Sequence, residues 1–237
     1  MQTKTSNSTG TDVILEVKDL TKYYISEDEE DNIISIIGFL KINEDLGING
    51  VSFDISKGRI IGLIGKKKCG KSTLLKLLSG VIKPSSGDIF YKGLKMNSQQ
   101  LKEIVSYISK EQPSSHEYNC TLFENLIQYT CKEQKERCDV VDKAEKLIND
   151  FELENYKYKE VIKLPSAVRS KMFIIRGFLS PKTILCFDHP LMFIEEKLQD
   201  TFKKYMNELV QAGKTIIIST DEENFLRSIC NEIITLD

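Results

Sequence analysis

Zinc ligands and paired cysteines are scarce in this sequence. Its six cysteines form no Cys-x-x-Cys pair, and its only histidines are His116 and His189. A structural zinc site needs four such side chains at short spacings, so we expect no zinc site here. The simplest interpretation of the cysteines is that they are reduced thiols in a cytosolic protein.

Long apolar runs and an excess of one charge are also absent. The longest strongly apolar stretch outside the predicted strands covers residues 33–40, whereas a membrane-spanning helix needs roughly 20 residues. The first twelve residues are polar and lack the apolar core of a signal peptide, so we expect a disordered tail at 1–12. The 33 basic and 35 acidic residues are nearly balanced, and we therefore expect no nucleic-acid partner.

One motif carries most of the chemical information. Residues 65–73 read Gly-Lys-Lys-Lys-Cys-Gly-Lys-Ser-Thr, which matches the phosphate-loop pattern G-x-x-x-x-G-K-[ST]. In such a loop the backbone N–H groups surround phosphates, Lys71 reaches the outer two, and the Ser72 hydroxyl binds magnesium. The apolar run 59–64 predicts a buried strand before the loop, and the leucines of 72–79 predict a helix after it. The order strand, loop, helix is the one the motif requires.

We therefore expect this segment to bind a nucleotide with magnesium. The residues predicted to contact the nucleotide are Gly65, Lys66, Lys67, Lys68, Cys69, Gly70, Lys71, Ser72 and Thr73. The lysines at 66–68 either strengthen phosphate binding or are simply solvated. Cys69 is either a small filler residue or a thiol whose thiolate is favoured by the neighbouring lysines and the helix N-terminus.

The rest of the chain alternates between strand and helix patterns. Such alternation around a phosphate loop predicts an α/β fold with a mainly parallel core sheet. Further strands are predicted at 13–20, 51–55, 88–91, 104–108, 183–187, 215–219 and 232–236, and further helices at 170–179, 194–212 and 222–229. Residues 120–163 are rich in Lys and Glu at helical spacing, which indicates a helical segment. The acidic run 27–31 and the apolar stretch 33–40 are either a solvated loop or a short helix on a membrane face or a partner.

In the order of these segments the chain resembles the nucleotide-binding domains of ABC (ATP-binding-cassette) transporters, from about residue 13 to its end. The segments that carry the resemblance are 17–24, 50–53, 62–80, 83–89, 185–190 and 213–220. The resemblance implies a P-loop NTPase of ABC type, in which a mainly parallel core sheet is joined by an antiparallel β subdomain and a helical subdomain. These would lie within a single domain at 13–237, with the helical subdomain at about 109–165 and an insertion at about 25–46.

The resemblance also implies cofactors, partners and a location. Tyr24 would stack on the adenine of ATP, Asp188 would hold Mg²⁺ together with Ser72, and Lys110 stands where the family has a nucleotide-sensing glutamine. Two such domains would close head to tail around ATP, and the helical subdomain would receive a transmembrane permease subunit. The chain would then be cytoplasmic and peripheral on the inner face of the cell membrane.

Three further motifs depart from the family pattern. His189 replaces the glutamate that activates the attacking water, and Asp221 replaces the switch histidine. The signature Leu-Ser-Gly-Gly-Gln is replaced by Leu-Pro-Ser-Ala-Val at 164–168, where Pro165 offers neither a hydroxyl nor an N–H to a phosphate. We expect a degenerate cassette that binds Mg-ATP and dimerises, preferably with a different cassette, but hydrolyses ATP poorly or not at all.

Two alternatives remain open at the level of the sequence. The chain is an active ATPase subunit with His189 as the base, because histidine is a common general base. Such a subunit would energise a transporter, and the position of the 25–46 insertion weakly resembles polysaccharide and teichoic-acid exporters. Otherwise the chain is a soluble regulatory cassette protein.

Overall fold

The computed structural model describes residues 12–25, 44–109, 119–130 and 137–236. The predicted tail (except for Asp12), most of the predicted 25–46 insertion, and Lys110 and His116 lie outside these residues. Among the residues that the structure describes, no helix is both long and apolar enough to cross a bilayer.

A five-stranded sheet forms the centre of the molecule, and all its neighbouring strands are parallel. In spatial order its strands are β6 (Val105–Ile108), β7 (Ile184–Asp188), β8 (Thr215–Ser219), β3 (Ile60–Gly65) and β9 (Glu232–Leu236). Every residue of β8 is buried, as expected for an inner strand covered on both faces. The predicted mainly parallel sheet is confirmed.

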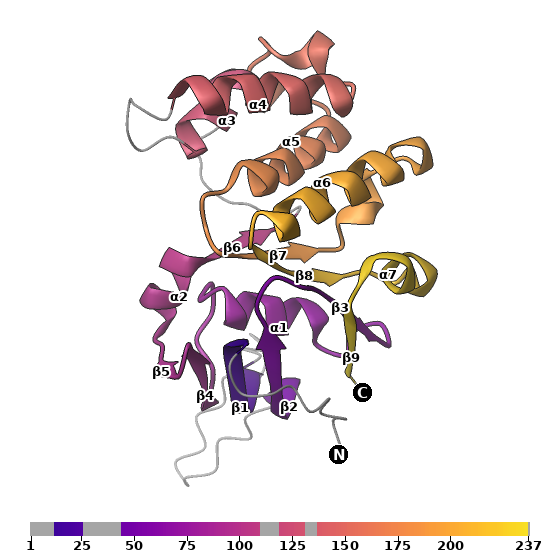
Figure 1. The fold of residues 1–237 in the computed structure, drawn as a ribbon. Coiled ribbons are helices and arrows are strands. Elements are labelled where there is room, and N and C mark those ends of the chain that lie inside the picture. The colour runs from indigo at the N-terminus through magenta and orange to yellow at the C-terminus, as the bar shows by residue number, and fades with distance from the viewer. Residues whose placement is uncertain (1–11, 26–43, 110–118, 131–136, 237) are drawn as a thin grey trace, which may run out of the picture.

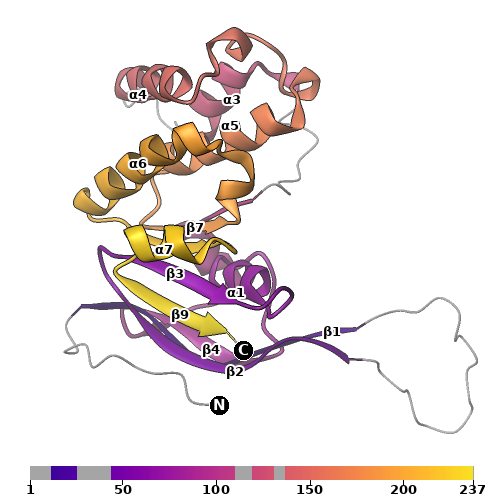
Figure 2. The same ribbon diagram turned by 90° about the vertical axis from the view of Figure 1, so that its right-hand side faces the viewer.

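A second, antiparallel sheet lies at one end of the molecule (Figure 1). Its order is β2 (Glu44–Ser56), β1 (Val13–Ile25), β4 (Ser86–Tyr91) and β5 (Leu94–Lys95). β1 and β2 are longer than predicted because their pairing continues beyond several register shifts to Ile25 and Glu44. Figure 2 shows this pair of strands extending sideways from the body of the protein.

The seven α-helices of the described residues lie in different parts of the molecule. The first is α1 (Lys71–Leu78), whose buried leucines share one core with residues of both sheets. Next, α3 (Leu122–Thr130), α4 (Arg137–Asp150) and α5 (Ser166–Leu179) lie at the end opposite the antiparallel sheet (Figures 1 and 2). The remaining helices are α2 (Ser98–Ile104), α6 (Gln199–Gln211) and α7 (Glu223–Ile229). A second core joins α3–α6 to the parallel sheet.

The helix predictions need three corrections. The helix predicted from residue 194 begins at Gln199, because residues 190–198 instead form two 3₁₀ turns, η5 (Pro190–Phe193) and η6 (Glu196–Leu198). The helix predicted from residue 170 begins at Ser166, directly after Pro165 at its N-cap. α2 was not predicted, although Asn97 and Gln100 form a capping box at its start.

Candidate functional site

The predicted phosphate loop connects β3 to α1, and its glycines are required by close packing. Gly65 has φ 153° and Gly70 has φ 97°. A Cβ atom would lie 2.2 Å from the Leu236 carbonyl oxygen at the first position and 2.2 Å from the Gly47 carbonyl oxygen at the second. A side chain is therefore excluded at both positions, and the loop backbone takes a shape that only glycine allows there.

Lys71 begins α1, and its ammonium group turns back under the loop. The side chain is only 4% exposed. Its Nζ donates to the carbonyl oxygens of Gly65 at 2.8 Å and Lys66 at 3.2 Å, and it lies 3.9 Å from Cys69 Sγ. Nζ also pairs with Asp221 Oδ1 at 3.3 Å. The Lys71 ammonium group therefore contacts both the phosphate loop and the turn after β8.

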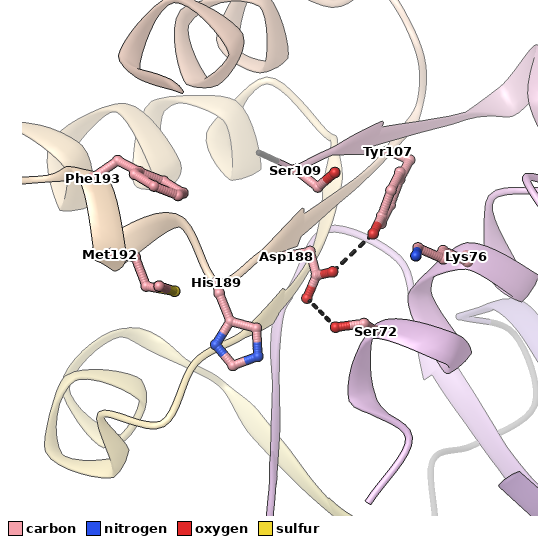
Figure 3. Close-up of a pocket in the computed structure, with 8 residues that line it drawn as sticks. All are labelled: Ser72, Lys76, Tyr107, Ser109, Asp188, His189, Met192 and Phe193. Atoms are coloured by element: carbon pink, nitrogen blue, oxygen red, sulfur yellow. Dashed lines mark hydrogen bonds between the residues drawn. The ribbon is translucent and has the colours of Figure 1, made fainter. Parts of the chain in front are cut away.

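Asp188, at the end of β7, is held by three hydroxyl groups. Ser72 Oγ donates to its Oδ1 at 3.0 Å, and Tyr107 OH donates to Oδ2 at 2.8 Å (Figure 3). Ser219 Oγ donates to Oδ1 at 2.7 Å. Burial, together with the nearby Asp188 carboxylate, raises the pKa of Tyr107 well above its ordinary value. The carboxylate is thus oriented from α1, β6 and β8 at once.

The donor atoms at this point suit magnesium. Mg²⁺ prefers oxygen ligands and usually keeps several waters, so it needs only one or two protein groups in addition to phosphate. Ser72 and Asp188 supply a hydroxyl and a carboxylate 3.0 Å apart. In the described part of the chain, no group of three or more His, Cys, Asp and Glu side chains is placed to hold a metal, so a metal bound entirely by such side chains is not indicated there.

His189 follows Asp188 in a left-handed backbone conformation, with φ 49° and ψ 48°. This conformation costs a non-glycine residue about 1–2 kcal/mol. It persists here with the backbone N–H of His189 donating to the Ser219 carbonyl oxygen at 3.0 Å. The imidazole lines the same cavity as Ser72 and Asp188 (Figure 3). His189 therefore lies in the cavity that contains the two predicted magnesium ligands.

Two adjoining cavities lie along the loop, with volumes of about 610 and 300 Å³, a range typical of small-molecule sites. The larger is lined by Tyr24, Gly47, Lys67, Lys68, Gly70, Lys71, Ser72, Thr73, His189, Met192 and Asp221. The smaller is lined by Ser72, Lys76, Tyr107, Ser109, Asp188, His189, Met192 and Phe193. Both contain residues from segments far apart in the sequence.

Tyr24 lies at the side of the larger cavity, on β1. Its hydroxyl is 3.2 Å from Thr73 Oγ1, and its side chain is among the exposed large hydrophobic groups at 40%. A Cβ atom at Gly47 would come within 2.8 Å of the Tyr24 ring. Tyr24 is thus close to the loop, with its ring packed against the backbone of β2.

Most of the predicted site residues come together, and a few do not line the cavities. Gly65, Lys66 and Cys69 belong to the loop but are not lining residues; the first two contribute carbonyl oxygens to Lys71. The altered signature at 164–168 lies at the start of α5 and lines neither cavity.

Sequence reasoning missed three residues of the site. Tyr107 and Ser219 hold Asp188, and Gly47 leaves space for Tyr24 and Gly70. The only signal for Ser219 is its place at the C-terminal end of a buried strand, where ligands of parallel sheets bind. Tyr107 and Gly47 carry no comparable signal: Tyr107 lies inside the strand predicted at 104–108, and Gly47 lies outside the strand predicted at 51–55.

Comparison with known proteins agrees with this geometry. The family model described as "ABC transporter" matches residues 48–192. The Spermidine/putrescine import ATP-binding proteins PotA of Mycoplasma capricolum subsp. capricolum and Mycoplasma mycoides subsp. mycoides SC are each 26% identical over an alignment of 217 residues that covers 88% of this chain. The chain spans 60% of the length of these relatives.

Solved structures share the fold. An ATP-binding subunit of an ABC transporter superposes with a TM-score of 0.72 at 21% identity, covering 94% of this chain and 85% of the other. A bacterial ABC transporter cassette solved as a dimer gives a TM-score of 0.73 at 18% identity, with 94% of both chains covered. The family model covers more than half of the sequence, and the fold follows the cassette architecture throughout. The chain belongs to the ABC transporter family, as a nucleotide-binding domain with the fold of a P-loop NTPase.

Proposed function

We propose that the chain is the ATP-binding subunit of an ABC transporter, and that it binds a magnesium–nucleotide complex while hydrolysing ATP slowly or not at all. One observation carries this proposal: the groups that hold phosphate and magnesium are assembled, while two groups that assist hydrolysis are replaced. Lys71, Ser72 and Asp188 meet at the cavities beside the loop. His189 and Asp221 line the larger cavity, and the resemblance to the family implies a glutamate and a histidine at these two positions.

The binding half of the proposal rests on the loop and on α1. Backbone N–H groups at the start of α1 and the Lys71 ammonium would hold the phosphates, since a helix N-terminus favours negative charge. Tyr24 lies beside Thr73, where its ring can stack on a base. Magnesium, when bound through Ser72 and Asp188, would neutralise phosphate charge.

The catalytic half is weakened on both sides of a head-to-tail dimer. A positioned general base contributes about 10²–10⁴-fold to a rate, and this chain has His189 where the family has its glutamate. Asp221 adds negative charge where the family has a histidine. On the opposite site this chain would supply the start of α5, where Pro165 at the N-cap makes no side-chain cap hydrogen bond.

We further propose that the chain pairs with a second, different cassette and with a transmembrane permease, on the cytoplasmic face of the cell membrane. Two of the structural neighbours were solved as dimers, one of them with bound ADP and phosphate. A homodimer would contain two sites altered in the same ways, so a different cassette is favoured if transport is driven by ATP. The helical subdomain at about 109–165 would contact the permease.

The second candidate is an active ATPase subunit. It is favoured by the position of the His189 imidazole, which lines the cavity beside Asp188 and can accept a proton from water. The resemblance to polysaccharide exporters depends on residues 25–46, most of which lie outside the described residues. The proposal therefore names neither cargo nor direction of transport.

A single-turnover experiment separates the two candidates. The purified chain is mixed with γ-labelled ATP and magnesium, trapped on a filter, and the bound nucleotide is separated to determine whether it is still ATP. Retained intact ATP supports the degenerate cassette. Steady release of phosphate that Lys71→Ala abolishes supports the active ATPase. No retention of nucleotide in either form contradicts the proposal.

A further inference from the structure

Asp221 is the acidic residue that contacts the phosphate-loop lysine. It lies in the turn between β8 and α7, and its Oδ1 is 3.3 Å from Lys71 Nζ. The Asp221 side chain is 66% exposed and lines the larger cavity, whereas the Lys71 side chain is 4% exposed. The carboxylate thus reaches the buried ammonium from the open side of the site.

The other contacts of Lys71 define the place that Asp221 occupies. An ammonium group has three N–H donors. Two of the contacts are to the carbonyl oxygens of Gly65 and Lys66, which belong to the loop itself. The Asp221 carboxylate is the anion in this set of contacts. In a nucleotide-loaded loop the same lysine reaches the outer phosphates, so Asp221 stands where a terminal phosphate would bind.

We propose that Asp221 makes this site selective for nucleoside diphosphates over triphosphates; the inference rests on the proposed nucleotide binding by residues 65–73. A diphosphate brings only its last phosphate to Lys71, so the Asp221 carboxylate can keep its contact with the ammonium group. A triphosphate must displace the Asp221 carboxylate from Lys71. Its third phosphate then lies beside a displaced carboxylate of the same sign.

The expected preference is moderate. Like charges a few ångströms apart repel strongly in a partly buried site, but the exposed carboxylate is screened by solvent. We expect the chain to bind Mg-ADP about tenfold more tightly than Mg-ATP at low salt. The preference should shrink at high salt, since screening weakens the repulsion of an exposed group.

The test measures the dissociation constants of Mg-ADP and Mg-ATP by titration calorimetry on the full chain. Asp221→Asn keeps the shape of the side chain and removes its charge, so it should bring the two constants to within about twofold, mainly by tightening ATP. Glu222→Gln is the matched control. Glu222 is exposed, lines neither cavity, and loses the same charge one position away, so this variant should keep the wild-type ratio.

Each other outcome overturns the inference. Equal affinities in the wild-type chain, or a ratio that Asp221→Asn leaves unchanged, would show that Asp221 does not select between the nucleotides. If the ratio is unchanged because Asp221→Asn tightens ATP and ADP equally, the carboxylate competes with any phosphate. In all these cases the proposed nucleotide binding still stands. Absence of binding by either nucleotide would overturn the proposed function together with this inference.

Discussion

Replacing Tyr107 with phenylalanine tests whether the Asp188 network is built as the structure indicates. The substitution removes one hydroxyl, which donates to Asp188 Oδ2 at 2.8 Å. The other carboxylate oxygen keeps both of its donors, Ser72 and Ser219. The variant therefore leaves one oxygen of a partly buried carboxylate without the tyrosine donor, and the ring that packs beside it is unchanged.

The expected cost follows from the charge of the acceptor. A hydrogen bond to a charged group contributes about 1.5–3 kcal/mol to stability, and Tyr107 is only partly buried, so we expect a loss of about 2 kcal/mol at neutral pH. For a chain of this length that corresponds to a decrease in Tm of about 4–8 °C. Nucleotide retention in the presence of magnesium should also weaken, because the carboxylate of Asp188 is less well oriented.

The stability lost in Tyr107→Phe should become smaller as the pH rises above the ordinary pKa of tyrosine. The pKa of Tyr107 is raised in the folded protein, mainly by burial and then by Asp188. Above the ordinary tyrosine pKa of 10.0, the unfolded chain therefore loses a proton that the folded chain keeps. Stability from Tyr107 is fully present below that pH and declines above it, so the difference between wild type and Tyr107→Phe should narrow in alkali.

The assay is chemical denaturation at neutral and alkaline pH, paired with filter retention of labelled nucleotide. Tyr205→Phe is the control, since its hydroxyl donates to Asp150 away from the cavities. Both variants should lose stability, but only Tyr107→Phe should lose retention. Equal retention in the two variants, or a Tyr107→Phe variant as stable as wild type at neutral pH, would refute the reasoning.

Three further predictions concern the loop and the residues beside it. Alkylating Cys69 should abolish nucleotide retention, because its sulfur contacts the ammonium group of Lys71. The Cys69→Ser variant should resist the reagent. Full nucleotide binding after complete modification of Cys69 would contradict the prediction. His189→Glu alone should leave phosphate release well below the rate of an active cassette, because Asp221 and the signature are unchanged; a normal rate would show that these departures matter little. Gly70→Ala should lower the free energy of unfolding by more than about 2 kcal/mol in denaturation experiments, because its Cβ would meet a backbone oxygen at 2.2 Å. The control is Gly58→Ala, which also has a positive φ but has open space around it, and it should lower that free energy by only about 1–2 kcal/mol. Equal losses in the two variants would argue against the close packing at Gly70.

The parts of the fold that follow local patterns were predicted well. The leucines of α1 recur at helical spacing, as predicted. Gly80 follows the end of this helix: its N–H donates to the Leu77 carbonyl, and the Val81 N–H donates to the Lys76 carbonyl. The start of α6 was predicted wrongly because residues 194–198 continue its apolar pattern, although Glu196–Leu198 fold into a 3₁₀ turn. Periodicity records which face is buried, and both conformations can bury the same face.

The candidate site also has one part that local sequence predicts and one part that it does not. The phosphate loop is a continuous segment whose glycines and lysine are determined by local chemistry, so its sequence alone predicted it. The contacts to Asp188 are different in kind, because Ser72 lies 116 positions away and Ser219 lies 31 positions away. No local pattern records which strand ends will be neighbours.

The sequence by itself determined the strand–loop–helix unit and the alternating α/β order, since each depends on residues close together in the chain. Only the tertiary structure decided that Tyr107 and Ser219 orient Asp188, and that Asp221 reaches Lys71. The physical reason is the strand order β6-β7-β8-β3, which brings the carboxyl ends of four separate strands to one edge of the sheet. Side chains distant in sequence share one site there because the sheet aligns the ends of the strands that carry them.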